Sequence, residues 1–108
     1  MTEWQVAWTA TAASDLRDIV DYIAQDNPTA ALAALKRLRV RAEALRNHPQ
    51  RGRIVPELRE AGALHYHELL ERPWRILYRI DGQRVLVLAV LDSRRDLQTL
   101  LLERLIRR

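Results

Sequence analysis

The alternation of apolar and polar positions is clearest between residues 72 and 96, where it predicts a β-hairpin followed by the start of a helix. The first strand would bury one face, because every second position carries a large apolar side chain: Trp74, Ile76, Tyr78 and Ile80. The pair Asp81-Gly82 favours a tight turn, since glycine adopts positive φ angles without a steric clash. Residues 85–91 are unbroken apolar, as in a central strand covered on both faces, although the run alone does not exclude a buried helix.

The N-terminal half predicts a strand and two helices. Residues 3–8 are expected to form the first strand, because alternate positions carry large apolar side chains: Trp4, Val6 and Trp8. A helix follows, with Thr9 or Thr11 as its N-cap and its acidic residues, Asp15 among them, on the side away from the core. Asn27-Pro28 ends this helix and opens a second one, which continues to residues 47–49.

The remaining segments are less regular. Residues 50–60 show no period, residues 64–70 predict a short strand, and both Gly52 and Gly62 are expected to serve turns. A capping-box pattern at residues 93–96 predicts a last helix from about Arg94 to Arg107. Its apolar stripe is broader than one sheet face needs, so either a partner covers part of it or it forms a thicker apolar face; the stripe consists of Leu97, Leu100, Leu101 and Leu105.

The order of elements is therefore β-α-α-β-β-β-α, an α+β arrangement within a single domain of residues 1–108. We expect a small antiparallel sheet built from residues 64–91, with the N-terminal helical hairpin packed on one face and a C-terminal helix after the last strand. The first strand is expected at an edge of the same sheet.

Charge is distributed unevenly along the chain. The net charge is +4 and the pI about 10.3. Residues 1–35 carry five acids and one arginine, whereas residues 36–53 carry seven basic residues and one acid. This asymmetry predicts an acidic partner, either a nucleic acid or an acidic protein segment.

Composition also excludes several classes. The chain has no cysteine, which excludes disulfides and thiolate metal sites. We see neither a signal peptide nor an apolar stretch long enough to cross a membrane, so a cytoplasmic protein without membrane contact is expected. No pattern indicates a cofactor.

Arginines supply the candidate chemistry. Arg94 and Arg95 would lie in the first turn of the last helix, where backbone N–H groups and guanidinium groups together favour phosphate or carboxylate. Arg75 and Arg79 would leave the hairpin strand on the face opposite Trp74 and could form a basic strip. Alternatively these arginines are solvated or paired with acids of the same region, namely Glu68, Glu71, Asp92 or Asp96.

Histidines are the only candidates for proton transfer near neutral pH. His65 and His67 would share one face of a strand, and His67 is followed by Glu68. An ordinary surface histidine is the alternative. The His-x-His pair lacks a third ligand at a recognisable spacing, so no metal site is predicted.

Three ordered segments resemble a known superfamily. They are A-x-S-D-L-x-D-I-x-D-Y-I with NP-x-A-A, then HPQRGRIVPELRE-x-G, and finally YHELLERPWRILYRIDGQRVLVLAVLDSRRDL-x-x-LL-x-x-R. Together they resemble the toxins of the RelE/ParE type II toxin–antitoxin superfamily, often called plasmid stabilisation proteins, over nearly the whole chain. The resemblance implies a compact toxin that a cognate antitoxin wraps and neutralises as a hetero-oligomer.

The resemblance implies two possible activities. RelE-type members cleave mRNA on the ribosome without a metal, whereas ParE-type members inhibit DNA gyrase. By resemblance to the nuclease type, Arg75 and Arg95 would hold phosphate, with Arg94 beside them and Arg53 as the basic residue of the middle loop. The nuclease type carries Tyr or His near the chain end, but this chain has leucine at 100–102, which cannot transfer protons.

The leading hypothesis is therefore a ParE-like toxin that inhibits gyrase by protein–protein contact, whereas an enzyme of this superfamily would be a metal-independent endoribonuclease. Arg79 and three leucines of the last helix are expected at the antitoxin or target interface; the leucines are Leu97, Leu101 and Leu105. The alternative is a ribosome-dependent mRNA endonuclease with His67 as its acid or base. A further alternative is a non-toxic binding module on the same fold.

Overall fold

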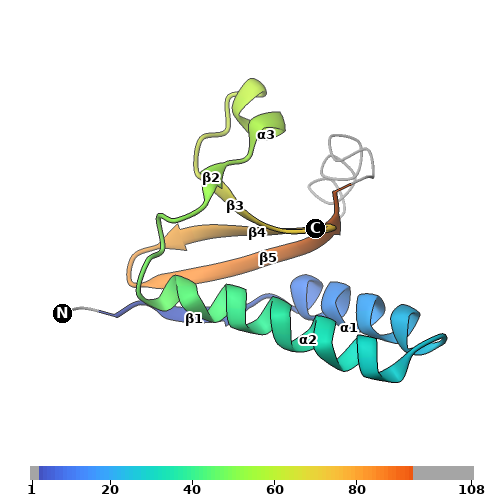
Figure 1. Ribbon diagram of the computed structural model, residues 1–108. Coiled ribbons are helices and arrows are strands. Elements are labelled where there is room, and N and C mark those ends of the chain that lie inside the picture. The colour runs from blue at the N-terminus through green and yellow to red at the C-terminus, as the bar shows by residue number, and fades with distance from the viewer. Residues whose placement is uncertain (1–2, 94–108) are drawn as a thin grey trace.

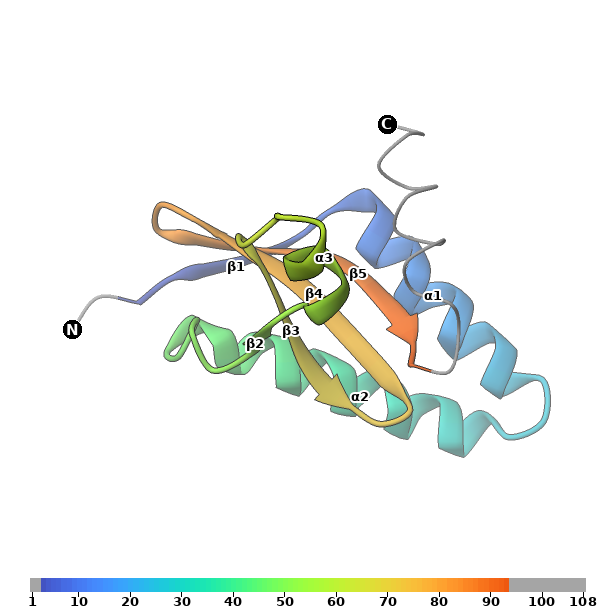
Figure 2. The ribbon, with the colours of Figure 1, turned by 90° about the horizontal axis from the view of Figure 1, so that it is seen from above.

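A twisted five-stranded sheet separates two unequal layers (Figures 1 and 2). The computed structural model describes residues 3–93. The strands lie in the order β1-β5-β4-β3-β2. Their bounds are Gln5–Trp8 (β1), Arg53–Ile54 (β2), Tyr66–Glu71 (β3), Trp74–Asp81 (β4) and Arg84–Asp92 (β5). The helices are Ala10–Ala24 (α1), Pro28–Glu43 (α2) and Pro56–Glu60 (α3), and a single 3₁₀ turn covers Ala44–Arg46 (η1).

The helical pair begins where the sequence predicts. Thr9, not Thr11, is the N-cap of α1, and its side chain accepts a hydrogen bond from the backbone N–H of Ala12. Asn27 caps α2 in the same way, with Pro28 at the first helical position. The two helices lie side by side on one face of the sheet, where they bury the larger core cluster.

The fold class predicted from the sequence is confirmed, including the antiparallel β3-β4-β5 meander and the helical pair on one face. The first strand does lie at an edge, where it pairs with β5 in parallel. The predicted C-terminal helix falls outside the described residues. The segment 50–60, predicted to be irregular, instead contributes the edge strand β2 and the short helix α3.

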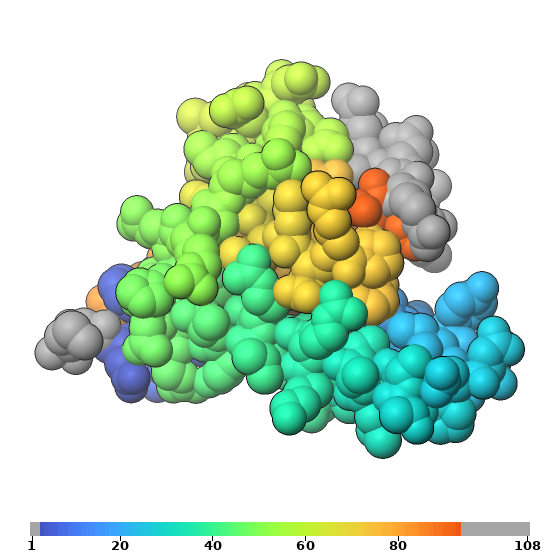
Figure 3. Space-filling view, viewed as in Figure 1, coloured from blue at the N-terminus to red at the C-terminus, as the bar shows by residue number. Residues whose placement is uncertain are grey.

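The α3 segment lies over part of the second face of the sheet (Figures 1 and 3). A smaller core cluster lies beneath it and consists of Val55, Leu77, Ala89 and Leu91, with Leu58 and Tyr66 packed against it. A register shift in the β4-β5 pairing falls between Leu77 and Tyr78 and leaves Leu88 without a partner residue on β4. Consequently Val87 faces the helical pair and Ala89 faces α3, so β5 is covered on both faces, as its apolar sequence predicts.

Asp15 corrects one prediction about α1. It was expected on the side away from the core, but its carboxylate accepts a hydrogen bond of 3.0 Å from the backbone N–H of Val90 in β5. The β1 strand stops pairing at Trp8, opposite Val87, so this part of β5 has no strand neighbour on that side. The carboxylate therefore satisfies a backbone donor that would otherwise be left at the end of the ladder.

Gly52 is needed for space and not for a turn conformation, which also corrects a prediction. A Cβ atom at this position would lie 2.4 Å from the backbone oxygen of Glu68 and 2.6 Å from the hydroxyl of Tyr78. The backbone N–H of Gly52 donates a hydrogen bond to that hydroxyl, which in turn donates to the carbonyl of Pro49. By contrast Gly62 and Gly82 have the positive φ angles expected of turn glycines.

Replacing Asp15 by alanine should lower the free energy of unfolding by about 1–3 kcal/mol, because the buried N–H of Val90 would lose its acceptor. Urea unfolding of Asp15→Ala and of the exposed control Asp18→Ala measures this. The control should change little, since the side chain of Asp18 is exposed and forms no ion pair or hydrogen bond within residues 3–93. Equal losses in the two variants would contradict the assigned role of Asp15.

Candidate functional site

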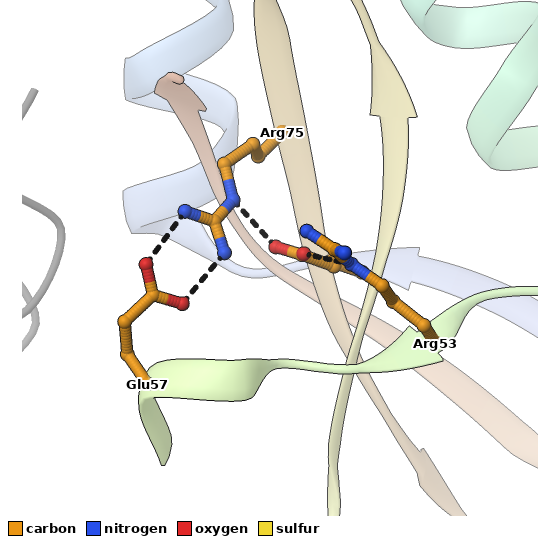
Figure 4. A network of polar contacts seen from close by, with 4 residues as sticks. Arg53, Glu57 and Arg75 are labelled. Carbon is orange, nitrogen blue, oxygen red and sulfur yellow. Dashed lines mark hydrogen bonds and ion pairs between the residues drawn. The ribbon is translucent and has the colours of Figure 1, made fainter. Parts of the chain in front are cut away.

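Four charged side chains form one connected network on the α3 face of the sheet (Figure 4). Glu68 lies at its centre: one carboxylate oxygen is 2.6 Å from Nε of Arg75, and the other is 2.7 Å from Nε of Arg53. The two terminal nitrogens of Arg75 donate to the two oxygens of Glu57 at 2.8 and 2.9 Å. The positive and negative charges therefore alternate along the network.

Strand register explains why three of these residues meet. Arg53 of β2 lies directly opposite Glu68 of β3. Glu68 is paired with Leu77 of β4, so Arg75, two residues before Leu77, is its diagonal neighbour on the same face. Glu57 comes from α3, which crosses above β4 and aims the carboxylate at the end of the Arg75 side chain.

Burial makes the pairing of these charges necessary. The side chain of Glu68 is 0% exposed and that of Arg75 8%, whereas Glu57 is 31% and Arg53 56% exposed. A buried charge is costly unless it is paired and hydrogen-bonded. The guanidinium of Arg75 lowers the pKa of the Glu57 carboxyl, and the two carboxylates, Glu57 foremost, raise the pKa of Arg75 despite its burial.

The predicted open basic strip is only partly present. Arg75 does leave β4 on the face opposite Trp74, but it is buried and bonded to two carboxylates, so its expected role as a phosphate ligand stays a prediction. The alternative of pairing with Glu68 is the one observed. Arg79, on the same face and opposite Tyr66, is half-buried and forms no ion pair within residues 3–93.

His67 lies on the other face of the sheet. Its ring stacks on Tyr78, which belongs to the core beneath the helical pair, with ring centroids 5.6 Å apart and an interplanar angle of 26°. Its Nδ1 atom is buried without a hydrogen-bond partner. His65 does not share a strand face with it, because β3 begins at Tyr66 and His65 is exposed before it. The structure therefore does not bring His67 together with Arg75.

The remaining predicted site residues lie outside the part of the chain that the structure describes: Arg94, Arg95, Leu97, Leu101 and Leu105. Residues 3–93 contain no group of three or more acidic or histidine side chains that could hold a metal ion. Among the same residues no helix has the length and apolar character required to cross a membrane.

Glu57 is the network member that sequence reasoning missed. The segment around it has no period, and its helix is only five residues long. One local signal was present: proline at the first helical position followed by an acid in the first turn is typical of a helix start. That signal predicts a helix but not the contact with Arg75, which depends on the path of β2.

The opposite side of the molecule carries an apolar groove. It lies between α1, α2 and Trp8 of β1, has a volume of about 420 Å³, and is lined by Trp8, Ala13, Leu16, Arg17, Val20, Asp21, Leu35 and Arg39. A neighbouring hollow of similar size adds Val40, which is 60% exposed. Two further large apolar side chains on the helical pair are exposed, Tyr22 and Leu32.

Replacing Glu57 by glutamine should lower the free energy of unfolding at pH 7 by about 1–3 kcal/mol, because Arg75 keeps its burial and loses a charged partner. A carboxyl whose pKa is lowered by folding stabilises the protein above its unfolded pKa, and this contribution disappears as the pH falls through the folded pKa. The difference between wild type and Glu57→Gln should therefore shrink below the ordinary pKa of 4.5.

Urea unfolding at pH 7 and at about pH 3 measures this dependence. Glu60→Gln is the matched control, since Glu60 is exposed on the same helix and forms no ion pair in the described part of the chain. A difference that is the same at both pH values would contradict the ionised pair.

Comparison with known proteins agrees with this architecture. Residues 6–97 match the family model described as the ParE toxin of the type II toxin–antitoxin system parDE. A chain of the chromosomal ParDE system from P. aeruginosa superimposes with a TM-score of 0.67 at 26% identity, covering 82% of this chain and 95% of that one. A chain of the toxin–antitoxin complex RelBE2 from Mycobacterium tuberculosis superimposes with a TM-score of 0.58 at 25% identity. This match covers 85% of the present chain and 93% of the RelBE2 chain.

A curated relative is the toxin RelE2 of Caulobacter vibrioides (strain ATCC 19089 / CIP 103742 / CB 15). It is 46% identical over 51 residues, which are 47% of this chain. The chain spans 58% of the length of that relative. The family match covers most of the chain and agrees with the fold, so this chain belongs to the ParE toxin family of type II toxin–antitoxin systems, within the RelE/ParE superfamily.

Proposed function

We propose that this protein is a cytoplasmic toxin that inhibits DNA gyrase by protein–protein contact, and that a cognate antitoxin neutralises it by binding as a hetero-oligomer. Membership of the ParE family and similarity to chains of the ParDE and RelBE2 systems support the toxin and antitoxin parts of this proposal. The choice of gyrase depends on the arrangement of the polar side chains.

The observation that carries the choice is the separation of Arg75 from His67 by the sheet. An RNA endonuclease that holds phosphate with Arg75 and moves protons with His67 needs both groups within reach of one scissile bond. Here Arg75 lies beneath α3 and is bonded to two carboxylates, whereas His67 stacks on Tyr78 on the opposite face. The leucines at 100–102 also lack groups that transfer protons.

The antitoxin is proposed to bind the helical pair. The groove beside Trp8 offers apolar walls, while Arg17, Asp21 and Arg39 provide charges of both signs at its rim. An amphipathic segment with apolar anchors would bury surface that the described chain leaves exposed, including Val40. In this proposal the antitoxin binds the face opposite the charged network.

Purified toxin should reduce the supercoiling of relaxed plasmid by gyrase in a dose-dependent manner, and the antitoxin should restore it. The matched assay is cleavage of mRNA on translating ribosomes, in which wild type and His67→Ala should both be inactive. Cleavage that is lost in His67→Ala would support the endonuclease instead. Absence of both activities together with tight antitoxin binding would support the non-toxic binding module.

Val40→Asp should weaken binding of the antitoxin by about tenfold or more, because a charge would have to be desolvated at an apolar contact. Titration calorimetry with the purified antitoxin measures the affinity. Leu64→Asp is the control, since Leu64 is 54% exposed and lies in the connection between α3 and β3. Similar losses in the two variants would indicate that the antitoxin does not bind at the groove.

A further inference from the structure

We propose that the guanidinium of Arg75 is a binding site for a carboxylate of an acidic protein segment, and that Glu57 occupies this site in the free protein. Binding would then be an exchange, in which the incoming carboxylate takes the place of Glu57. The identification of the ligand as a protein segment rests on the proposed function, which acts through protein partners. The exchange itself rests on the geometry of the network.

Only one of the two carboxylates on Arg75 is replaceable. Glu68 is 0% exposed, sits on a strand inside the sheet, and also binds Arg53. Glu57 is 31% exposed and sits on α3 at the surface. An incoming group can therefore approach the side of Arg75 that faces Glu57, where both terminal nitrogens point (Figure 4).

The segment that carries Glu57 is held by few other contacts. Helix α3 has five residues, none of them buried, and no side chain caps its start. Such a short helix is not stable by itself. A backbone hydrogen bond from Val55 to Tyr66 fixes the chain before the helix, and Leu58 packs only partly against the smaller core cluster. Small movements of α3 can therefore withdraw Glu57 while β2 stays in place.

Withdrawal of Glu57 without a replacement is unfavourable. Arg75 is 8% exposed, so its two terminal nitrogens would keep a charge with neither a partner nor full hydration. The site therefore opens when another anion is present to take the two hydrogen bonds. A carboxylate fits this position, because the planar group of Glu57 already makes both bonds at 2.8 and 2.9 Å.

Neighbouring cations favour a segment with several acids over a single anion. Arg53 keeps a guanidinium that is 56% exposed beside Glu68. Arg79 lies four residues along β4 from Arg75, roughly 13 Å away in a strand, and has no ion-pair partner within residues 3–93. Once Glu57 leaves, three arginines face one remaining carboxylate, so an extended segment with repeated acids would be attracted to this face.

The first experiment measures binding of a fluorescent peptide in which glutamate alternates with alanine, by anisotropy at fixed salt. Glu57→Gln should bind it about tenfold more tightly than wild type, because the intramolecular competitor is weakened. Glu60→Gln, which changes the net charge equally on the same helix, should differ from wild type by less than about twofold. The double variant Glu57→Gln/Arg75→Gln should lose the gain.

A second measurement uses the unaltered protein, in case Glu57→Gln folds poorly. Saturating peptide should increase hydrogen–deuterium exchange at the amides of Arg59 in α3 and of Gly62 just after it, because their bonds to the carbonyls of Val55 and Arg59 maintain the helix and the turn that follows. Exchange in β4 should stay unchanged. Equal affinities of Glu57→Gln and Glu60→Gln, with no added exchange in α3, would overturn the proposal.

An oligouridine of similar length is the competing probe. If Glu57→Gln gains affinity for the oligouridine but not for the peptide, the ligand is a phosphodiester, and the assignment to an acidic protein segment is wrong. Supercoiling assays on the same preparations test the proposed function separately. If the wild-type protein binds the peptide at Arg75 as predicted but does not inhibit gyrase, only the proposed target is wrong.

Discussion

The buried carboxylate of Glu68 is the constraint on which the α3 face depends. A fully desolvated charge requires partners at both oxygens, and the sheet register supplies one guanidinium for each, from Arg53 and Arg75. Arg75 then has two terminal nitrogens left inside a buried space, which Glu57 satisfies. That last contact ties α3, a segment with no buried residue of its own, to the sheet together with the packing of Leu58 and the backbone bond of Val55.

The sheet also divides the molecule into two surfaces with different chemistry. The face beneath α1 and α2 holds most of the apolar core, and its outer groove is largely apolar. The α3 face holds the charged network above a smaller cluster. A partner that binds the groove and a partner that engages Arg75 would therefore not compete directly, although a segment long enough to pass round an edge of the sheet could reach both.

Local sequence patterns predicted most of the elements but not the contacts between them. The hairpin, both long helices and the caps at Thr9 and Asn27 depend on residues close in the sequence, so periodicity was sufficient. The face on which Arg75 emerges was also predictable from alternation. Its occupation by Glu57 was not, because that contact joins segments whose packing depends on β2, a strand of two residues without a sequence signature.

The parallel pairing of β1 with β5 has a consequence for synthesis of the chain. Gln5 of β1 pairs with Arg84 of β5, so the first strand remains without its neighbour until almost all of the described residues have been translated. Contacts of such long range form slowly, because the entropy of closing a large loop is lost before the contacts stabilise the chain. During synthesis the helical pair is therefore translated well before β5, and until β5 is available the sheet-facing side of that pair lacks part of its cover.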